Sequence, residues 1–138
     1  MDNELFELRK EVYGKTGLGR MDTSSPTDYY TVQGKSLPVA WENFDDSGKL
    51  TFMLNKGWAL PLYTSDYLLE KLPRNIGSYG LEMWSYPSDD GVAFGYYDTL
   101  AKRWHQTIPQ RGDRLPLKAL LKLTLALHEA GELKYVGQ

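Results

Sequence analysis

The spacing of hydrophobic residues predicts a helix near each end of the chain. Apolar residues recur at helical intervals over residues 4–13. A wider apolar stripe, rich in leucine, lies between Pro116 and Gly131. Pro is favoured at the first position of a helix and Gly just beyond its last residue, so these two residues mark the bounds of the predicted final helix. Its apolar side must be buried, and a sheet is the expected partner.

Shorter apolar runs predict strands in the middle of the chain. The runs at 37–44 and 50–54 flank the turn-like sequence Asp-Asp-Ser-Gly and predict a β-hairpin. A second hairpin is predicted from 81–86 and 92–98, because the intervening Asp-Gly favours a tight turn. A third strand over 102–108 then completes a three-stranded meander.

A short helix is predicted between the two hairpins. Thr64 or Ser65 can accept the free N–H groups of a first helical turn, and Pro73 ends the segment. The sequence therefore predicts a two-turn helix over 65–72.

Alternation in the second hairpin predicts two apolar faces. An even-membered turn places Leu81 and Met83 on one face, with Val92, Phe94 and Tyr96. The opposite face then holds Trp84, Tyr86, Ala93, Gly95 and Tyr97. In a sheet with water on one side, apolar and polar residues alternate more regularly along each strand. Either helices therefore cover both faces, or the Trp84 face is a binding surface.

Together these elements predict one α+β domain over residues 1–138. Its antiparallel β-sheet, a hairpin plus a three-stranded meander, has helices packed on both faces. Residues 14–36 are rich in Gly, Ser, Thr, Pro and Asp, which predicts a flexible or partly ordered connection.

Composition narrows the classes of function. The chain is 41% hydrophobic and 25% charged, typical of a globular domain, and its net charge of −2 gives no overall attraction to nucleic acid. Between Lys102 and Lys122 there are six basic side chains and one acidic one, interpreted as a solvated loop and helix face. The absence of Cys excludes disulfides and thiolate metal sites. Without an apolar leader or membrane-length run, we expect a cytoplasmic protein, in a host cell if phage-encoded.

Two apparent ligand-binding motifs fail on spacing. Gly14-Lys15-Thr16 matches the end of a phosphate-binding loop, but such a loop needs a Gly five residues earlier, where the chain has Arg9. We therefore interpret Gly14 as a helix stop. The segment 43–48 resembles the start of a calcium loop, but Leu54 stands where a bidentate Glu is required. No cofactor or metal is expected.

The remaining chemical candidates also have ordinary interpretations. His105 and His128 are the only histidines, and neither has a carboxylate nearby at metal-ligand spacing. Arg111-Gly112-Asp113 is an RGD tripeptide, which we expect in a loop without adhesive function, with Asp113 helping to cap the final helix. No catalytic residues are predicted.

Ten Tyr and four Trp make aromatic residues the main candidate for recognition. The candidate surface consists of Trp84, Tyr86, Tyr97 and Trp104 with basic neighbours Arg103, Arg111 and Arg114. The alternative is that these rings fill a second layer of the core. The glycines and aromatic residues of 91–97 resemble those of an aromatic RNA-binding strand, but the basic residue that begins such a strand is absent.

The second half of the chain shows a resemblance to a known family. It begins with Pro61-Leu62-Tyr63-Thr64-Ser65-Asp66 and continues with a short helix, an aromatic hairpin and a final helix that starts with Pro. It resembles small proteins encoded by phages and prophages that have an α–β–α sandwich domain, with Thr-Ser here in place of their Ser-Thr. The resemblance covers the second half of the chain. It implies a fold and a phage-like origin, and it implies no catalytic residues.

Three classes of function remain open. The leading expectation is a non-enzymatic, phage-type accessory protein that binds and inhibits another protein, such as a host or defence factor. The second is a module that binds single-stranded nucleic acid through the same aromatic residues. The third is a small-molecule-binding or enzymatic domain with residues 14–36 as a lid. The oligomeric state is left open.

Overall fold

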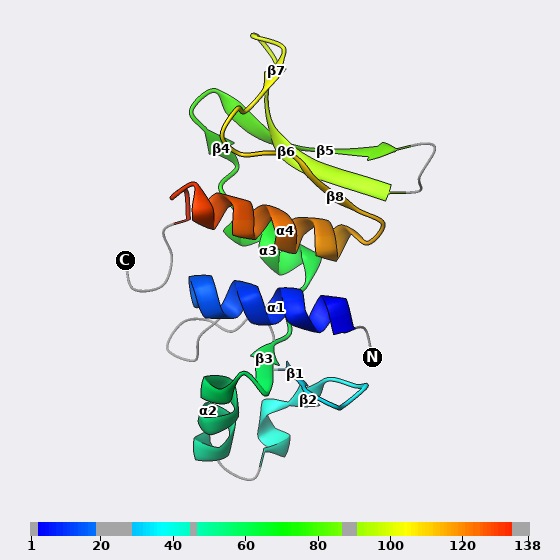
Figure 1. Ribbon diagram of the computed structural model, residues 1–138, viewed down its shortest axis with the longest axis vertical. Helices are drawn as coiled ribbons and strands as arrows, with labels where there is room; N and C mark the ends of the chain where they lie inside the picture. Colours follow the sequence, from blue (N-terminus) through cyan, green and yellow to red (C-terminus); the bar gives the residue numbers. More distant parts are fainter. Residues whose placement is uncertain (1–2, 19–28, 45–46, 87–90, 134–138) are drawn as a thin grey trace. The chain divides into compact units, whose positions relative to one another are not determined.

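The computed structural model describes residues 3–18, 29–44, 47–86 and 91–133 (Figure 1). Their contacts group the chain into two compact units, residues 1–64 with 135–138 (unit 1) and residues 65–134 (unit 2). The described residues form four α-helices and two antiparallel sheets, so the predicted α+β class is confirmed. That the whole chain is one domain stays a prediction.

Unit 1 consists of two helices and a small sheet. Its elements are α1 (Asn3–Thr16), β1 (Tyr29–Val32), β2 (Val39–Ala40), a 3-10 turn (Trp41–Asn43), α2 (Ser47–Lys56) and β3 (Ala59–Pro61). The strand order is β2-β1-β3, and both pairings are antiparallel. Tyr30 and Val32 from β1 pack in one core cluster with Leu50 and Leu54 from α2. The sheet is thus buried against α2 on the side of these residues.

The predicted hairpin at 37–44 and 50–54 is wrong, because its second half is the helix α2. Leu50 and Leu54 are buried and Met53 packs against the same cluster, so the apolar residues follow helical rather than alternating spacing. Gly57, with a φ of +74°, ends the helix. The N–H of Trp58 donates to the carbonyl of Met53, a bond that often closes helices before such a glycine.

The predicted first helix is confirmed and is longer than expected. α1 continues through Gly14 to Thr16, so the interpretation of Gly14 as a helix stop is wrong. The stop is Gly17, with a φ of +67°, whose N–H donates to the carbonyl of Tyr13. The connection predicted over 14–36 is correspondingly shorter, since its ends belong to α1 and β1; residues 19–28 lie outside the described part.

Unit 2 contains the larger sheet. Its elements are α3 (Ser65–Lys71), β4 (Asn75–Ile76), β5 (Tyr79–Tyr86), β6 (Gly91–Asp98), β7 (Arg103–Trp104), β8 (Arg111–Asp113) and α4 (Pro116–Glu129). The strand order is β4-β5-β6-β7, and β8 also pairs with β6. The predicted short helix, second hairpin and final helix are confirmed. The predicted third strand is shorter, because β7 spans only two residues; the turn at 87–90 lies outside the described residues.

One face of this sheet carries the helices of unit 2. Met83 pairs with Phe94 and Leu81 with Tyr96, which confirms the predicted side-chain parity. Phe94 and Tyr96 are buried, α4 contacts β6 and β8, and α3 contacts α4. The hydroxyl of Tyr96 donates to the carbonyl of Pro73, just beyond α3 (2.7 Å). Figure 1 shows both helices on the same side of β5 and β6, which we call the helix face.

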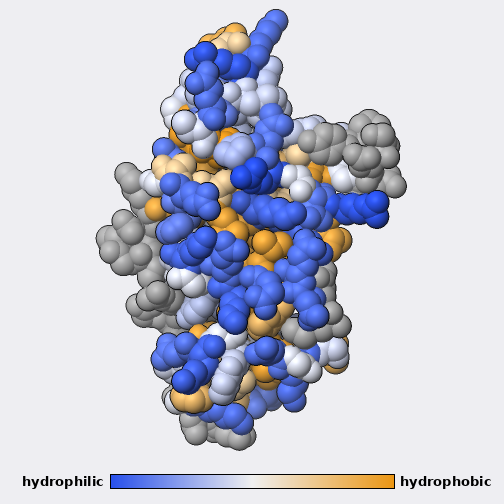
Figure 2. Space-filling model, viewed as in Figure 1, coloured by the Kyte–Doolittle hydropathy of each residue, from blue (hydrophilic) through white to orange (hydrophobic). Residues whose placement is uncertain are grey.

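The turn between β6 and β7 is organised by Asp98. Its carboxylate accepts hydrogen bonds from the N–H groups of Leu100 and Ala101 (both 3.0 Å) and from the hydroxyl of Ser78 (2.7 Å). Leu100 in this turn is 93% exposed, and Figure 2 shows hydrophobic and hydrophilic residues side by side at this end of unit 2. Asp98 thereby fixes the return of the chain into β7.

Protonation of Asp98 should destabilise this turn. The N–H of Ala101 and the hydroxyl of Ser78 hold the pKa of Asp98 below its ordinary value. A lowered folded-state pKa stabilises the fold above the unfolded-state pKa, and this contribution is lost as pH falls through the folded value. We expect Asp98→Asn to flatten the fall of unfolding free energy below about pH 4. Urea titrations across that range measure it; a fall as steep as in the wild type would contradict this role.

Candidate functional site

Three aromatic rings meet on the face of the unit 2 sheet opposite to the helix face. The ring of Trp104 lies 4.3 Å from that of Trp84 and 4.7 Å from that of Tyr97, between centroids. Tyr97 in β6 and Trp104 in β7 are direct cross-strand partners. Trp84 lies in β5, where it pairs with Ala93 of β6. All three are half-buried. We call these residues the aromatic cluster and their side of the sheet the aromatic face.

Gly95 provides the space for this cluster. A Cβ atom at Gly95 would lie 3.4 Å from two ring atoms of Trp104 and 3.1 Å from Cγ of Gln110. The Trp104 ring and the Gln110 side chain therefore rest on bare backbone. Sequence reasoning missed both Gly95 and Gln110, although a glycine inside a strand often marks such a close approach.

A shallow hollow of about 310 Å³ adjoins the cluster. It is lined by Glu82, Met83, Trp84, Tyr97, Thr99 and Trp104. Glu82 pairs with Gly95, which places it on the aromatic face beside Trp84. The hollow thus offers aromatic walls and one carboxylate, and none of the described residues that line it is basic. This chemistry suits an apolar or a cationic group.

The basic residues predicted for this surface are not gathered with the rings. Arg103 pairs with Asp98 and Arg111 with Phe94, which puts both on the side of the sheet away from Tyr97 and Trp104. Arg114 is exposed and follows β8. Tyr86 pairs with Gly91 at the end of the ladder, and its side chain lies outside the described part. Of the seven candidates, only the aromatic cluster is shown to be contiguous.

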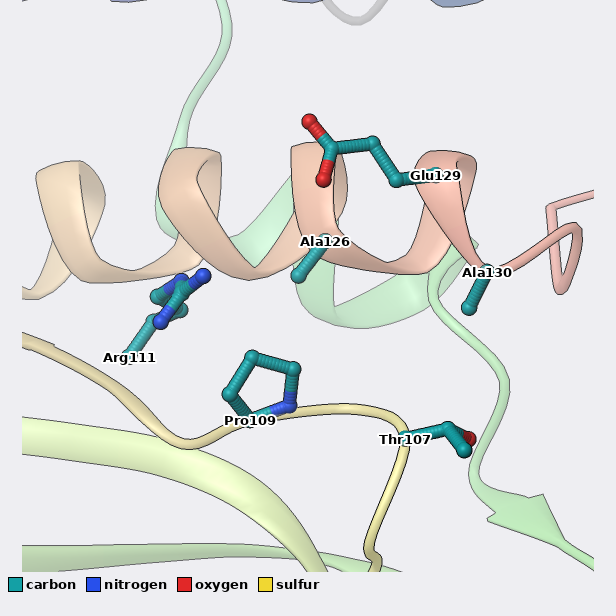
Figure 3. Close-up of a pocket in the computed structure, with 6 residues that line it drawn as sticks. All are labelled: Thr107, Pro109, Arg111, Ala126, Glu129 and Ala130. Atoms are coloured by element: carbon teal, nitrogen blue, oxygen red, sulfur yellow. The ribbon is translucent and has the colours of Figure 1, made fainter.

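Arg111 instead lines a second hollow of about 310 Å³, on the helix face (Figure 3). Figure 3 shows its guanidinium group directed toward α4, where Ala126 and Ala130 face the β7–β8 connection. The other lining residues are Thr107, Pro109 and Glu129. The guanidinium group therefore belongs to the packing region between β8 and α4.

The RGD tripeptide is the strand β8, so the expectation that it lies in a loop is wrong. Asp113 accepts a hydrogen bond from Nζ of Lys122 on α4 (2.8 Å) and one from the N–H of Leu115 (3.2 Å). Burial alone would raise the pKa of Asp113, but the bonds from Lys122 and Leu115 lower it overall. Asp113 thus links β8 to the start of α4. The prediction that it caps the helix is wrong, because the N-cap residue is Leu115 and no side chain makes a capping hydrogen bond there.

The two histidines occupy separate places in unit 2. The ring of His105 lies 4.7 Å from that of Tyr79, and its Nδ1 is within 3.2 Å of the Thr107 hydroxyl. His128 is half-buried in α4. Among the described residues, no three His, Cys, Asp or Glu side chains are grouped so that they could hold a metal ion. Within the same residues, no helix is both long and apolar enough to cross a bilayer.

Comparison with family models, curated proteins and solved structures finds no match to this chain.

Proposed function

We propose that this chain acts by binding another protein, with the aromatic cluster as the centre of the interface. The observation that carries the proposal is the contact of Trp84, Tyr97 and Trp104 on a sheet face away from α3 and α4. Tyr and Trp are enriched at the centres of protein interfaces, where they contribute a large share of the binding free energy. Half-buried rings that hold one another in place present such a surface with little loss of side-chain freedom.

The charges around the cluster favour a protein partner over a nucleic acid at this site. Glu82 lines the hollow, whereas Arg103 and Arg111 lie toward the other face. A phosphate backbone would meet a carboxylate where it needs cations. An aliphatic, proline or basic side chain of a protein meets aromatic walls and, if basic, a counter-charge. Together with the resemblance to phage-encoded proteins, this supports a host protein as the partner.

Substitution of Trp104 tests the proposal. The wild-type chain, immobilised on beads, is mixed with nuclease-treated lysate of the cell in which the gene is expressed, and the captured protein is then purified. Since Trp104 contacts both other rings, we expect Trp104→Ala to weaken the purified partner's affinity by at least about 2 kcal/mol, or roughly thirtyfold.

Arg111→Ala is the matched control, because Arg111 lines the hollow on the helix face. It should leave the affinity within about twofold of wild type. Calorimetric titration of the purified partner measures both variants. Unchanged affinity in Trp104→Ala, with its fold intact by circular dichroism, would exclude the aromatic cluster as the binding surface.

A further inference from the structure

We propose, resting on the protein-binding function above, that the aromatic cluster binds an extended segment of the partner that carries a basic side chain. The segment pairs with the free edge of β5, and its basic side chain enters the hollow beside Glu82. Two separate features support this: unpaired backbone groups along β5, and a carboxylate beside aromatic walls.

β5 has an unpaired edge along most of its length. β4 pairs with it only at Tyr79 and Gly80. Among the described strands, none pairs with the outer side of residues 82–86, since β6 occupies the inner side throughout. Such an edge presents N–H and C=O groups to which another strand can be added.

The backbone groups of Met83 and Ser85 face this edge. The N–H of Leu81 donates outward, to the carbonyl of Arg74 (2.8 Å). Tyr96, opposite Leu81 on β6, accepts its bond from the residue after β7 instead. Backbone groups alternate in direction along an antiparallel strand, so those of Met83 and Ser85 also point outward. Both residues are exposed, so a peptide can approach them.

A side chain of an added strand would reach the aromatic cluster from this edge. Residues directly opposite one another in paired strands share a face, so a residue opposite Glu82 or Trp84 points to the aromatic face. The hollow extends to the edge, because Met83 lines it although its side chain belongs to the helix face. Trp84 lies nearest to the added strand, and it contacts Trp104, which contacts Tyr97.

Glu82 selects a basic side chain at this position. Its carboxylate lines the hollow, and no ion pair or hydrogen bond engages it within the described part of the chain. Ring faces attract a cation, and the carboxylate adds a counter-charge. Arg suits both contacts, because its planar guanidinium group stacks on rings and pairs with carboxylates. An apolar side chain would cover Glu82 without pairing it.

Most basic residues of unit 2 lie on the other face of the sheet. From residue 75 to residue 101 the sequence contains four acidic residues and no Lys or Arg. Arg74 stands opposite Leu81 and so belongs to the helix face. Arg103 and Arg111 belong to the same face. These three cations are therefore directed away from the hollow.

Two further basic residues lie at a distance from the β5 edge. Lys102 is in the turn after Thr99. Thr99 is four residues beyond Gly95, the partner of Glu82, which is about 13 Å at strand spacing. Arg114 follows β8, which β6 separates from β5. A segment on the β5 edge therefore meets Glu82 before either cation.

A peptide of defined sequence tests the proposal without the partner. The probe is the acetylated and amidated peptide Thr-Val-Thr-Arg-Thr-Val-Thr, titrated into the ¹⁵N-labelled full chain and followed by NMR. We expect saturable binding, with the largest shifts at the amides of Met83 and Ser85 and the indole N–H groups of Trp84 and Trp104. Replacing Arg in the probe by citrulline, a neutral group of similar shape, should lower affinity at least about fivefold.

Glu82→Gln and N-methylated probes separate the two features. Glu82→Gln should weaken the Arg probe at least about threefold and leave the citrulline probe within about twofold. Arg103→Gln, on the helix face, is the matched charge control and should leave both within about twofold. Only alternate N–H groups of an added strand face β5. Of two probes N-methylated at alternate positions, one should therefore keep its affinity and the other lose at least about tenfold.

The proposal is overturned if no probe saturates at millimolar concentration, if the Arg and citrulline probes bind equally, or if the two N-methylated probes do. It is also overturned if sedimentation shows a dimer that Ser85→Pro dissociates, because a second copy would then occupy the edge. The proposed function fails separately, when Trp104→Ala keeps its affinity for the captured partner. A partner that Trp104→Ala weakens but Ser85→Pro, which removes an outward N–H, leaves unchanged would overturn the strand pairing alone.

Discussion

Leu123→Ala in α4 is expected to lower the free energy of unfolding by about 2–5 kcal/mol. Leu123 is fully buried, together with its neighbours Leu120, Leu121 and Leu127. α4 contacts β6, β8 and α3, so a cavity there removes contacts from a helix that touches most of unit 2. For a domain whose total stability is about 5–15 kcal/mol, this is a large fraction.

Denaturant titration measures this loss, and the slope of unfolding free energy against denaturant concentration should stay the same as in the wild type. Leu123→Met keeps the volume and should cost less than about 1.5 kcal/mol. Leu115→Ala lies at an exposed position before the same helix and should change stability by no more than about 0.5 kcal/mol. If Leu115→Ala and Leu123→Ala lowered the free energy of unfolding equally, the Leu123 side chain would not be buried in the core, contrary to the structure.

The parts of the fold that were predicted correctly have strong short-range signals. The final helix has a wide apolar stripe between Pro116 and Gly131, and the structure places the helix over Pro116–Glu129. The long hairpin was predicted with the correct parity because β5 and β6 are adjacent in sequence, and alternation propagates from one tight turn.

The errors arose where the sequence signal is short or the contact is distant. Residues 50–54 contain too few positions to separate helical from alternating spacing, so the sequence predicts a strand where the structure has α2. β8 pairs with Phe94 and Ala93 across a long connection, which no local pattern specifies.

The structure brings together only part of the candidate surface, and the reason is physical. Trp84 and Tyr97 share a face by alternation, and Trp104 joins them because it pairs directly with Tyr97. Arg103 was grouped with these rings by proximity in sequence, but adjacent residues of a strand point to opposite sides. Only the register of β7 and β8 on β6 shows where Arg103 and Arg111 belong.

Gly95→Val is expected to displace the Trp104 ring and so dismantle the aromatic cluster. A Cβ at this position would already lie 3.1 Å from Gln110 Cγ and 3.4 Å from the Trp104 ring, and the valine methyl groups extend further. Val is favoured in strands, so poor strand propensity cannot explain a loss. We expect a destabilisation of about 1–3 kcal/mol from overpacking. Partner binding should fall as far as in Trp104→Ala.

The effect of Gly95→Val on the cluster can be measured by circular dichroism, because Trp84 and Trp104 lie close together. Rings of Trp84 and Trp104 at 4.3 Å couple their electronic transitions, so the wild type should show a tryptophan couplet in circular dichroism. Gly95→Val should abolish it, whereas Gly80→Ala should keep it. Gly80 is the cross-strand partner of Tyr97, and a Cβ there meets only Asn75 Oδ1 at 3.4 Å. If the couplet survived in Gly95→Val, the ring of Trp104 would not depend on bare backbone at Gly95. If Gly95→Val abolished both the couplet and partner binding while the helices stayed intact, the space left by the absent side chain at Gly95 would be what allows the aromatic cluster to form.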